Sequence, residues 1–180
     1  MSFESDTTDP SEIRAVEVTH SPARFSSVLA VAAGLLAVLI TGLFAPISAP
    51  VGLFGLAGLA AGLFVFESER LTIAGTAIVF VGVVVCGFIA TAPEALLLAT
   101  LATIVAFDLG SNAFSVGRQL SDQTETQRGE AVHAAATIFV GVIAAGLSYG
   151  VFLVPSGGLT IAALALLLLS ALFLTWSIRQ

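Results

Sequence analysis

Long apolar runs separated by short polar or proline-containing breaks make up most of this chain. The first run begins at Phe25, and two prolines in the stretch APISAP at 45–50 end it, because proline removes a backbone donor and blocks helix continuation. Runs of about 20 apolar residues are long enough to cross a bilayer core as a helix. The pattern predicts six membrane spans, the second starting at residue 47 or 51: 25–45, 47–66, 71–90, 93–109, 131–154 and 159–178.

One polar stretch, AFDLGSNAFSVGRQLSDQTETQRGEAVHAA at 106–135, separates the fourth run from the fifth. Read at helical spacing, its residues divide between two faces, which is the pattern of an amphipathic helix. The apolar face carries Leu109, Ala113, Val116 and Leu120, and the polar face carries Asp108, Asn112, Ser115, Gln119 and Asp122. The fourth helix is therefore expected to continue beyond the membrane, to about residue 121.

A second helix is expected to start directly after this one. TETQ at 124–127 fits a capping box, in which Thr124 caps the helix and Gln127 bonds back to it. The two helices would form a hairpin at about 108–133 on the cytoplasmic side. Two ion pairs, Arg118 with Asp122 and Glu125 with Arg128, would connect its tip at helical spacing.

The arginines indicate the orientation in the membrane. With six spans, every basic residue falls on one side, and positive residues favour the cytoplasm. These residues are Arg14, Arg24, Arg70, Arg118, Arg128 and Arg179. We therefore expect a polytopic, all-α helix bundle in the plasma membrane, with about six transmembrane helices and both termini in the cytoplasm.

The composition supports this class and excludes others. Only 10% of the residues are charged and 57% are hydrophobic, whereas about 25% of an average soluble domain is charged. The net charge of −6 and the absence of lysine argue against nucleic acid, whose affinity comes from cationic contacts to phosphate. An acidic chain without lysine is typical of a halophile. Residues 1–24 are predicted to be an acidic, disordered cytoplasmic tail, and 25–178 the membrane domain.

The sequence supplies few groups for chemistry. Cys86 is the only cysteine and lies in an apolar run, which favours a small buried side chain and excludes an internal disulfide. The chain contains no HExxH, GxSxG or Walker A motif. We predict no catalytic residues, no metal site and no cofactor, although an enzyme that uses Asp108 and His133 as acid and base stays open as the least favoured alternative.

Candidate functional residues lie in the polar stretch. They are Asp108, Asn112, Arg118, Asp122, Glu125, Arg128, Glu130 and His133. A solvated connection between spans is the simplest interpretation, since runs of charge are usually solvated. The favoured functional hypothesis is an accessory or scaffold subunit that presents the hairpin to a cytoplasmic or membrane partner. The alternative is a small-solute transporter or channel with Asp108, Asn112 and His133 at its inner mouth, near Glu130 and Thr137.

Glycines predict where helices approach one another closely. Gly58 and Gly62 form a small-xxx-small pattern, which permits close helix packing in a membrane. Packing inside one bundle is favoured over a homodimer through these two glycines. Besides a protein partner, the predicted membrane spans are expected to contact lipid.

The segment FDLGSNAFSVGRQLSDQTETQRGEAVHAAA resembles a group of small, uncharacterised multi-pass membrane proteins of haloarchaea. The resemblance covers about residues 94–178, and the acidic, lysine-free composition is similar. It implies a multi-pass membrane protein of a halophilic organism. It implies no activity and no functional residues.

Overall fold

The computed structural model describes residues 22–89, 92–119 and 127–153, and every regular element in these ranges is a helix. The elements are α1 (Arg24–Phe44), η2 (Pro46–Ser48), α2 (Ala49–Phe64), α3 (Glu69–Ile89), α4 (Pro93–Gln119) and α5 (Gln127–Leu153). Five helices are long and apolar enough to cross a membrane. The all-α prediction is confirmed, and the first five predicted spans coincide with helices. The predicted sixth span at 159–178 and the predicted tail, up to residue 21, lie outside the described residues.

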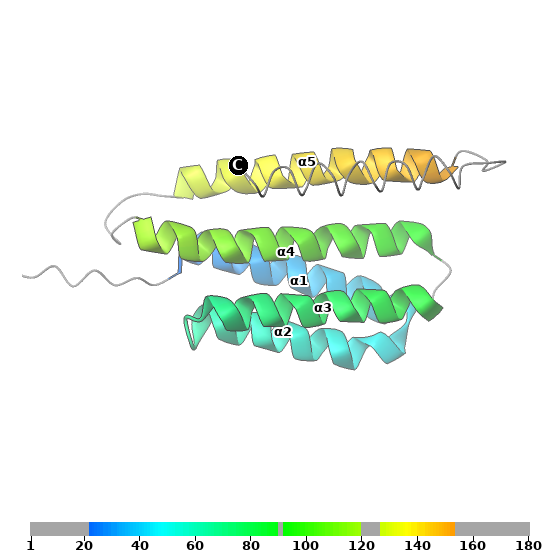
Figure 1. Ribbon diagram of the computed structural model, residues 1–180, viewed down its shortest axis with the longest axis horizontal. Coiled ribbons are helices and arrows are strands. Elements are labelled where there is room, and N and C mark those ends of the chain that lie inside the picture. Colours follow the sequence, from blue (N-terminus) through cyan, green and yellow to red (C-terminus); the bar gives the residue numbers. More distant parts are fainter. Residues whose placement is uncertain (1–21, 90–91, 120–126, 154–180) are drawn as a thin grey trace, which may run out of the picture. The chain divides into compact units, whose positions relative to one another are not determined.

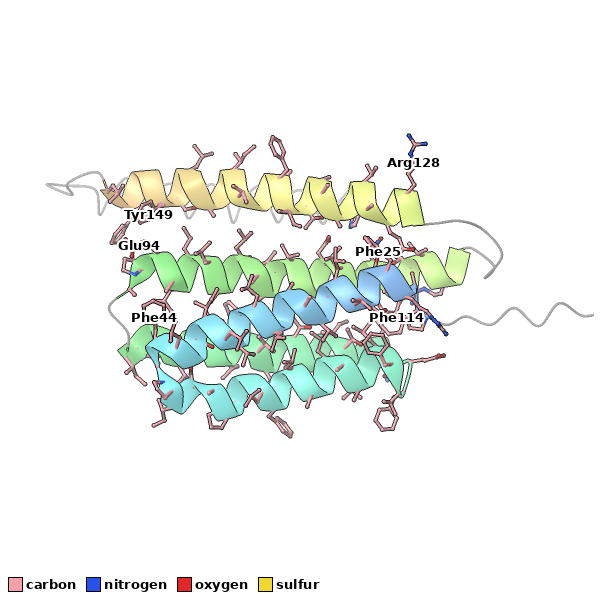
Figure 2. All side chains as sticks on the ribbon, turned by 180° about the vertical axis from the view of Figure 1, so that it is seen from behind. Phe25, Phe44, Glu94, Phe114, Arg128 and Tyr149 are labelled. Carbon is pink, nitrogen blue, oxygen red and sulfur yellow. The ribbon has the colours of Figure 1, made fainter. Side chains whose placement is uncertain are left out.

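Helices α1 to α4 run alternately up and down (Figure 1). Phe25 of α1 and Phe114 of α4 lie at one end, while Phe44 of α1 and Glu94 of α4 lie at the other (Figure 2). Helix α2 packs most closely on α3, α1 packs on α4, and these two pairs also contact each other. Short connections between antiparallel helices produce this arrangement.

Prolines and a serine mark the starts of the helices that follow the breaks in the hydrophobic pattern. Pro46 and Pro50 stand in the first turns of η2 and α2, where a missing backbone donor costs nothing. Between α2 and α3, Glu67 has a positive φ of 45°. The next residue, Ser68, accepts a hydrogen bond through its hydroxyl from the Leu71 backbone amide at 3.4 Å, which caps the start of α3.

Glycine allows α2 and α3 to pack with their backbones in contact. Gly55, Gly58 and Gly62 of α2 all face α3 of the same chain, and Gly75 of α3 lies among them. A Cβ on Gly75 would contact the Leu59 amide nitrogen and lie 2.6 Å from the Gly58 carbonyl carbon. Gly58 and Gly62 thus pack inside the bundle, which is the alternative that the sequence favoured. The contribution of Gly75 was not predicted.

Alanine has the same role between α1 and α4. The buried face of α4 consists mostly of small side chains at helical spacing: Ala95, Ala99, Ala102, Ala106, Leu109 and Ala113. Ala30 and Ala37 of α1 are also fully buried. This stripe continues past Asp108, which explains why the apolar part of the fourth predicted span looked short: one face turns polar while the other remains in the core.

The predicted extension of the fourth helix is present among the described residues. Helix α4 has 27 residues, about 40 Å at 1.5 Å per residue, and ends at Gln119, close to the expected position. Leu109, Ala113 and Phe114 lie in the hydrophobic core, so residues 109–114 pack within the bundle. The tip of the predicted hairpin, at 120–126, lies outside the described residues, and with it Thr124 of the proposed capping box.

The chain divides into two compact units, and the division falls within helix α5, between Val142 and Ile143. In the second unit, the Tyr149 and Phe152 rings stack with centroids 6.1 Å apart, and the Ser148 hydroxyl donates to the Ala144 carbonyl at 2.8 Å. In the first unit, residues 128–142 of α5 bury only Glu130 and Ala134. Most of its apolar side chains are therefore exposed in the described structure.

Candidate functional site

Asp108 of α4 receives two hydrogen bonds from α5. The Thr137 hydroxyl donates to Asp108 Oδ2 at 2.7 Å, and His133 Nε2 lies 2.9 Å from the same oxygen. Because a carboxylate only accepts, Nε2 must carry a proton for this bond to form. We call Asp108, His133 and Thr137 the Asp108 cluster. The sequence predicts these three residues near the mouth of spans four and five, and the structure brings them into contact.

The periodicity of α5 explains how the cluster forms. Glu130, His133 and Thr137 are spaced by three and four residues, so they share one face of the helix. In the same stretch, a Cβ placed on Gly141 would contact the Leu101 side chain of α4. The polar face of α5 is thus the face that contacts the other helices, while large apolar side chains such as Phe139 and Val140 are exposed.

The Asp108 cluster is half-exposed. The side chains of His133 and Asp108 are 43% and 38% exposed, so water reaches the pair. A carboxylate beside an imidazole can hold a proton, stabilise an imidazolium or orient the ring for acid–base chemistry. Within the ranges that the structure describes, no group of three His, Cys, Asp or Glu residues could hold a metal ion.

Glu130 forms the second link between α5 and the bundle. The residue is 4% exposed, and its Oε2 accepts hydrogen bonds from both the Ser26 amide at 2.9 Å and the Ser26 hydroxyl at 2.7 Å. Ser26 lies in the first turn of α1, where free backbone amides and the helix dipole favour a negative charge. The two Ser26 donors and the start of α1 therefore offset the cost of burying the Glu130 carboxylate.

Arg118 has a partner that the sequence did not indicate. Its Nη1 donates to Glu69 Oε2 of α3 at 2.7 Å, and the two side chains are 52% and 38% exposed. An exposed pair of this kind contributes only about 0.2–1 kcal/mol. Since Asp122 lies outside the described residues, its predicted pairing with Arg118 stays a prediction, as does the pairing of Glu125 with Arg128.

The remaining candidate residues have simpler surroundings. Asn112 is half-buried on α4, one turn after Asp108, and Arg128 is exposed at the start of α5. Ser26 and Glu69 were missed as partners, because Ser26 lies at the start of one apolar run and Glu69 just before another. Polar side chains are ordinary at such helix ends. Only the packing of distant helices shows what they bind.

The described helices define a class: an all-α protein whose five helices could each cross a membrane, with polar side chains linking them. The chain belongs to DUF7519, a family of unknown function, which residues 20–175 match. No curated protein and no solved structure matches the chain. The haloarchaeal origin implied by the resemblance stays a prediction.

Proposed function

We propose that this protein is a non-enzymatic accessory or scaffold subunit of the cell membrane, which binds another membrane protein through α5 and the connection that precedes it. One observation carries the proposal. Helix α5 has 27 residues and leaves its large apolar side chains exposed, with Leu147, Phe139 and Val140 at 68%, 67% and 64%. A helix that leaves so much apolar surface uncovered is suited to contact lipid and a partner helix.

The contacts of the polar residues sharpen the docking hypothesis. Arg118, Glu130 and Asp108 are engaged inside the chain, which leaves Arg128 exposed beside the connection. Together with Asp122 and Glu125, known from the sequence, Arg128 is the better candidate to contact a partner. Charged residues at the rim of an interface mainly set specificity and association rate.

We expect the triple variant D122A/E125A/R128A to lose a co-purifying partner. The experiment is affinity purification of the full chain from its own membranes in mild detergent, with quantification of the co-purifying proteins. The matched control is E69A/R118A, which removes an internal ion pair at the same end of the bundle. The control should keep the partner, and both variants should insert into the membrane as the parent does.

Equal partner recovery with the triple variant would remove the support for docking at this connection. Recovery of the protein alone would favour the second candidate, a small-solute transporter or channel. The contact of Asp108 with His133 and Thr137 favours that candidate, since ionisable groups on membrane helices often mark solute paths. Flux into proteoliposomes, compared between the parent protein and D108N, would then separate the two.

The six-span topology, with both termini in the cytoplasm, belongs to the same proposal. Support comes from the one-sided distribution of arginine and from the five described candidate spans. In a Cys86→Ala background, Glu67→Cys and Glu94→Cys make the same change at exposed positions predicted on opposite sides. An impermeant maleimide added outside intact cells should label position 94 and leave position 67 unlabelled. The reverse pattern, or labelling of both, contradicts the topology.

A further inference from the structure

The start of α5 is attached to the described bundle chiefly by polar contacts. Of residues 128–142, only Glu130 and Ala134 are buried. Helices α1 to α4 supply the other buried residues of the two core clusters, to which this stretch of α5 adds Ala134. The polar contacts include those of the Asp108 cluster and of Glu130 with Ser26. A helix held in this way has little apolar burial to keep it in place, so a change in one polar contact alters its attachment noticeably.

We infer that Asp108, His133 and Thr137 form a proton-binding site whose occupancy sets how firmly the start of α5 is held against α4. The geometry supports this directly: His133 Nε2 lies 2.9 Å from the same Asp108 oxygen to which the Thr137 hydroxyl donates. Histidine is the side chain that normally gains or loses its charge near neutral pH. The inference is independent of the accessory role and concerns the motion of α5 only.

The charged groups nearest His133 determine which contact is affected when the ring is protonated. Asp108 of α4 is the charged side chain in contact with His133 among the described residues. Glu130, one turn earlier on α5, is buried and bonded to Ser26 of α1. Arg118 of α4 is paired with Glu69 of α3. A proton on His133 therefore meets one carboxylate directly, and its main electrostatic effect falls on the contact between α4 and α5.

The two charge states of the His133 ring determine whether protonation strengthens or weakens the attachment of α5. Protonated His133 forms a charge-assisted bond with the Asp108 carboxylate, whereas neutral His133 retains at best one ordinary donor and loses the attraction between opposite charges. The attachment of α5 is therefore firmer when His133 is charged and weaker once it has lost its proton. Because the pair is half-exposed, we expect the ratio of held to released α5 to change roughly two- to fivefold.

Spin-label distances in the full-length protein test this inference. In a Cys86→Ala background, labels at Leu98→Cys of α4 and Val140→Cys of α5 occupy exposed positions. In lipid nanodiscs, double electron–electron resonance should show a longer, broader component that grows roughly two- to fivefold between about pH 6 and about pH 8.5. Labels at Leu39→Cys of α1 and Leu98→Cys of α4 form the control pair, whose distances should not change.

Three variants assign the effect to the site. H133Q keeps a donor that never becomes charged, and D108N removes the carboxylate, so both should abolish the pH dependence of the α4–α5 distance. E130Q changes the neighbouring contact and should keep the dependence. An α4–α5 distance that does not respond to pH in the parent protein overturns the inference, as does a response that persists in H133Q. D108N provides a second test if H133Q fails to fold.

Discussion

Gly75→Ala is expected to destabilise the protein by about 3 kcal/mol, because a single added methyl group has no room. The new Cβ would contact the Leu59 amide nitrogen and approach the Gly58 carbonyl carbon to 2.6 Å and the Gly55 carbonyl oxygen to 2.8 Å. These are backbone atoms, which cannot rotate away as the end of a side chain can. Helices α2 and α3 must separate, and their shared packing is lost along its length.

The measurement is thermal unfolding of the purified protein in detergent, followed by circular dichroism. Gly146→Ala is the matched control, since no atom lies within 4 Å of a Cβ placed there. In that variant alanine should stabilise the helix by about 0.5–1 kcal/mol through backbone entropy. If Gly75→Ala unfolds at the temperature of the parent protein, the close contact between α2 and α3 is not as described.

Glu130→Ala is expected to cost about 3 kcal/mol of unfolding free energy, because it leaves the buried Ser26 amide and hydroxyl without their shared acceptor. Both bonds are short, at 2.9 and 2.7 Å, and both end on one carboxylate oxygen. Loss of the negative charge also removes a favourable interaction with the N-terminus of α1. We expect the start of α1 and the start of α5 to loosen together.

Chemical unfolding in detergent measures this loss, and hydrogen exchange at the Ser26 amide reports on it locally. Glu130→Gln should lie between the parent protein and Glu130→Ala, since an amide oxygen still accepts from Ser26 but carries no charge. The nearby exposed Arg128→Ala should change stability by no more than about 0.5 kcal/mol. Equal effects of Glu130→Ala and Arg128→Ala would show that the Ser26 contact contributes little.

The candidate site could be predicted only in part from the sequence. Asp108, Glu130, His133 and Thr137 were identified because polar residues stand out in an apolar chain and these lie at the predicted mouth of spans four and five. Their partners could not be predicted in the same way. Ser26 precedes Glu130 by 104 residues and Glu69 precedes Arg118 by 49, and no local periodicity links positions so far apart.

The sequence by itself determined the helices of the described residues and their all-α class. Apolar run length, prolines near residues 46–50 and the amphipathic face after Asp108 were enough to predict five helices at the described positions, because these signals act within a few turns of one chain segment. Only the tertiary structure decided which small residues lie in contact, such as Gly75 against α2, and which carboxylate meets Ser26. Those choices depend on how whole helices pack, since contact between distant segments is set by the fit of their surfaces and by the need to pair every buried polar group.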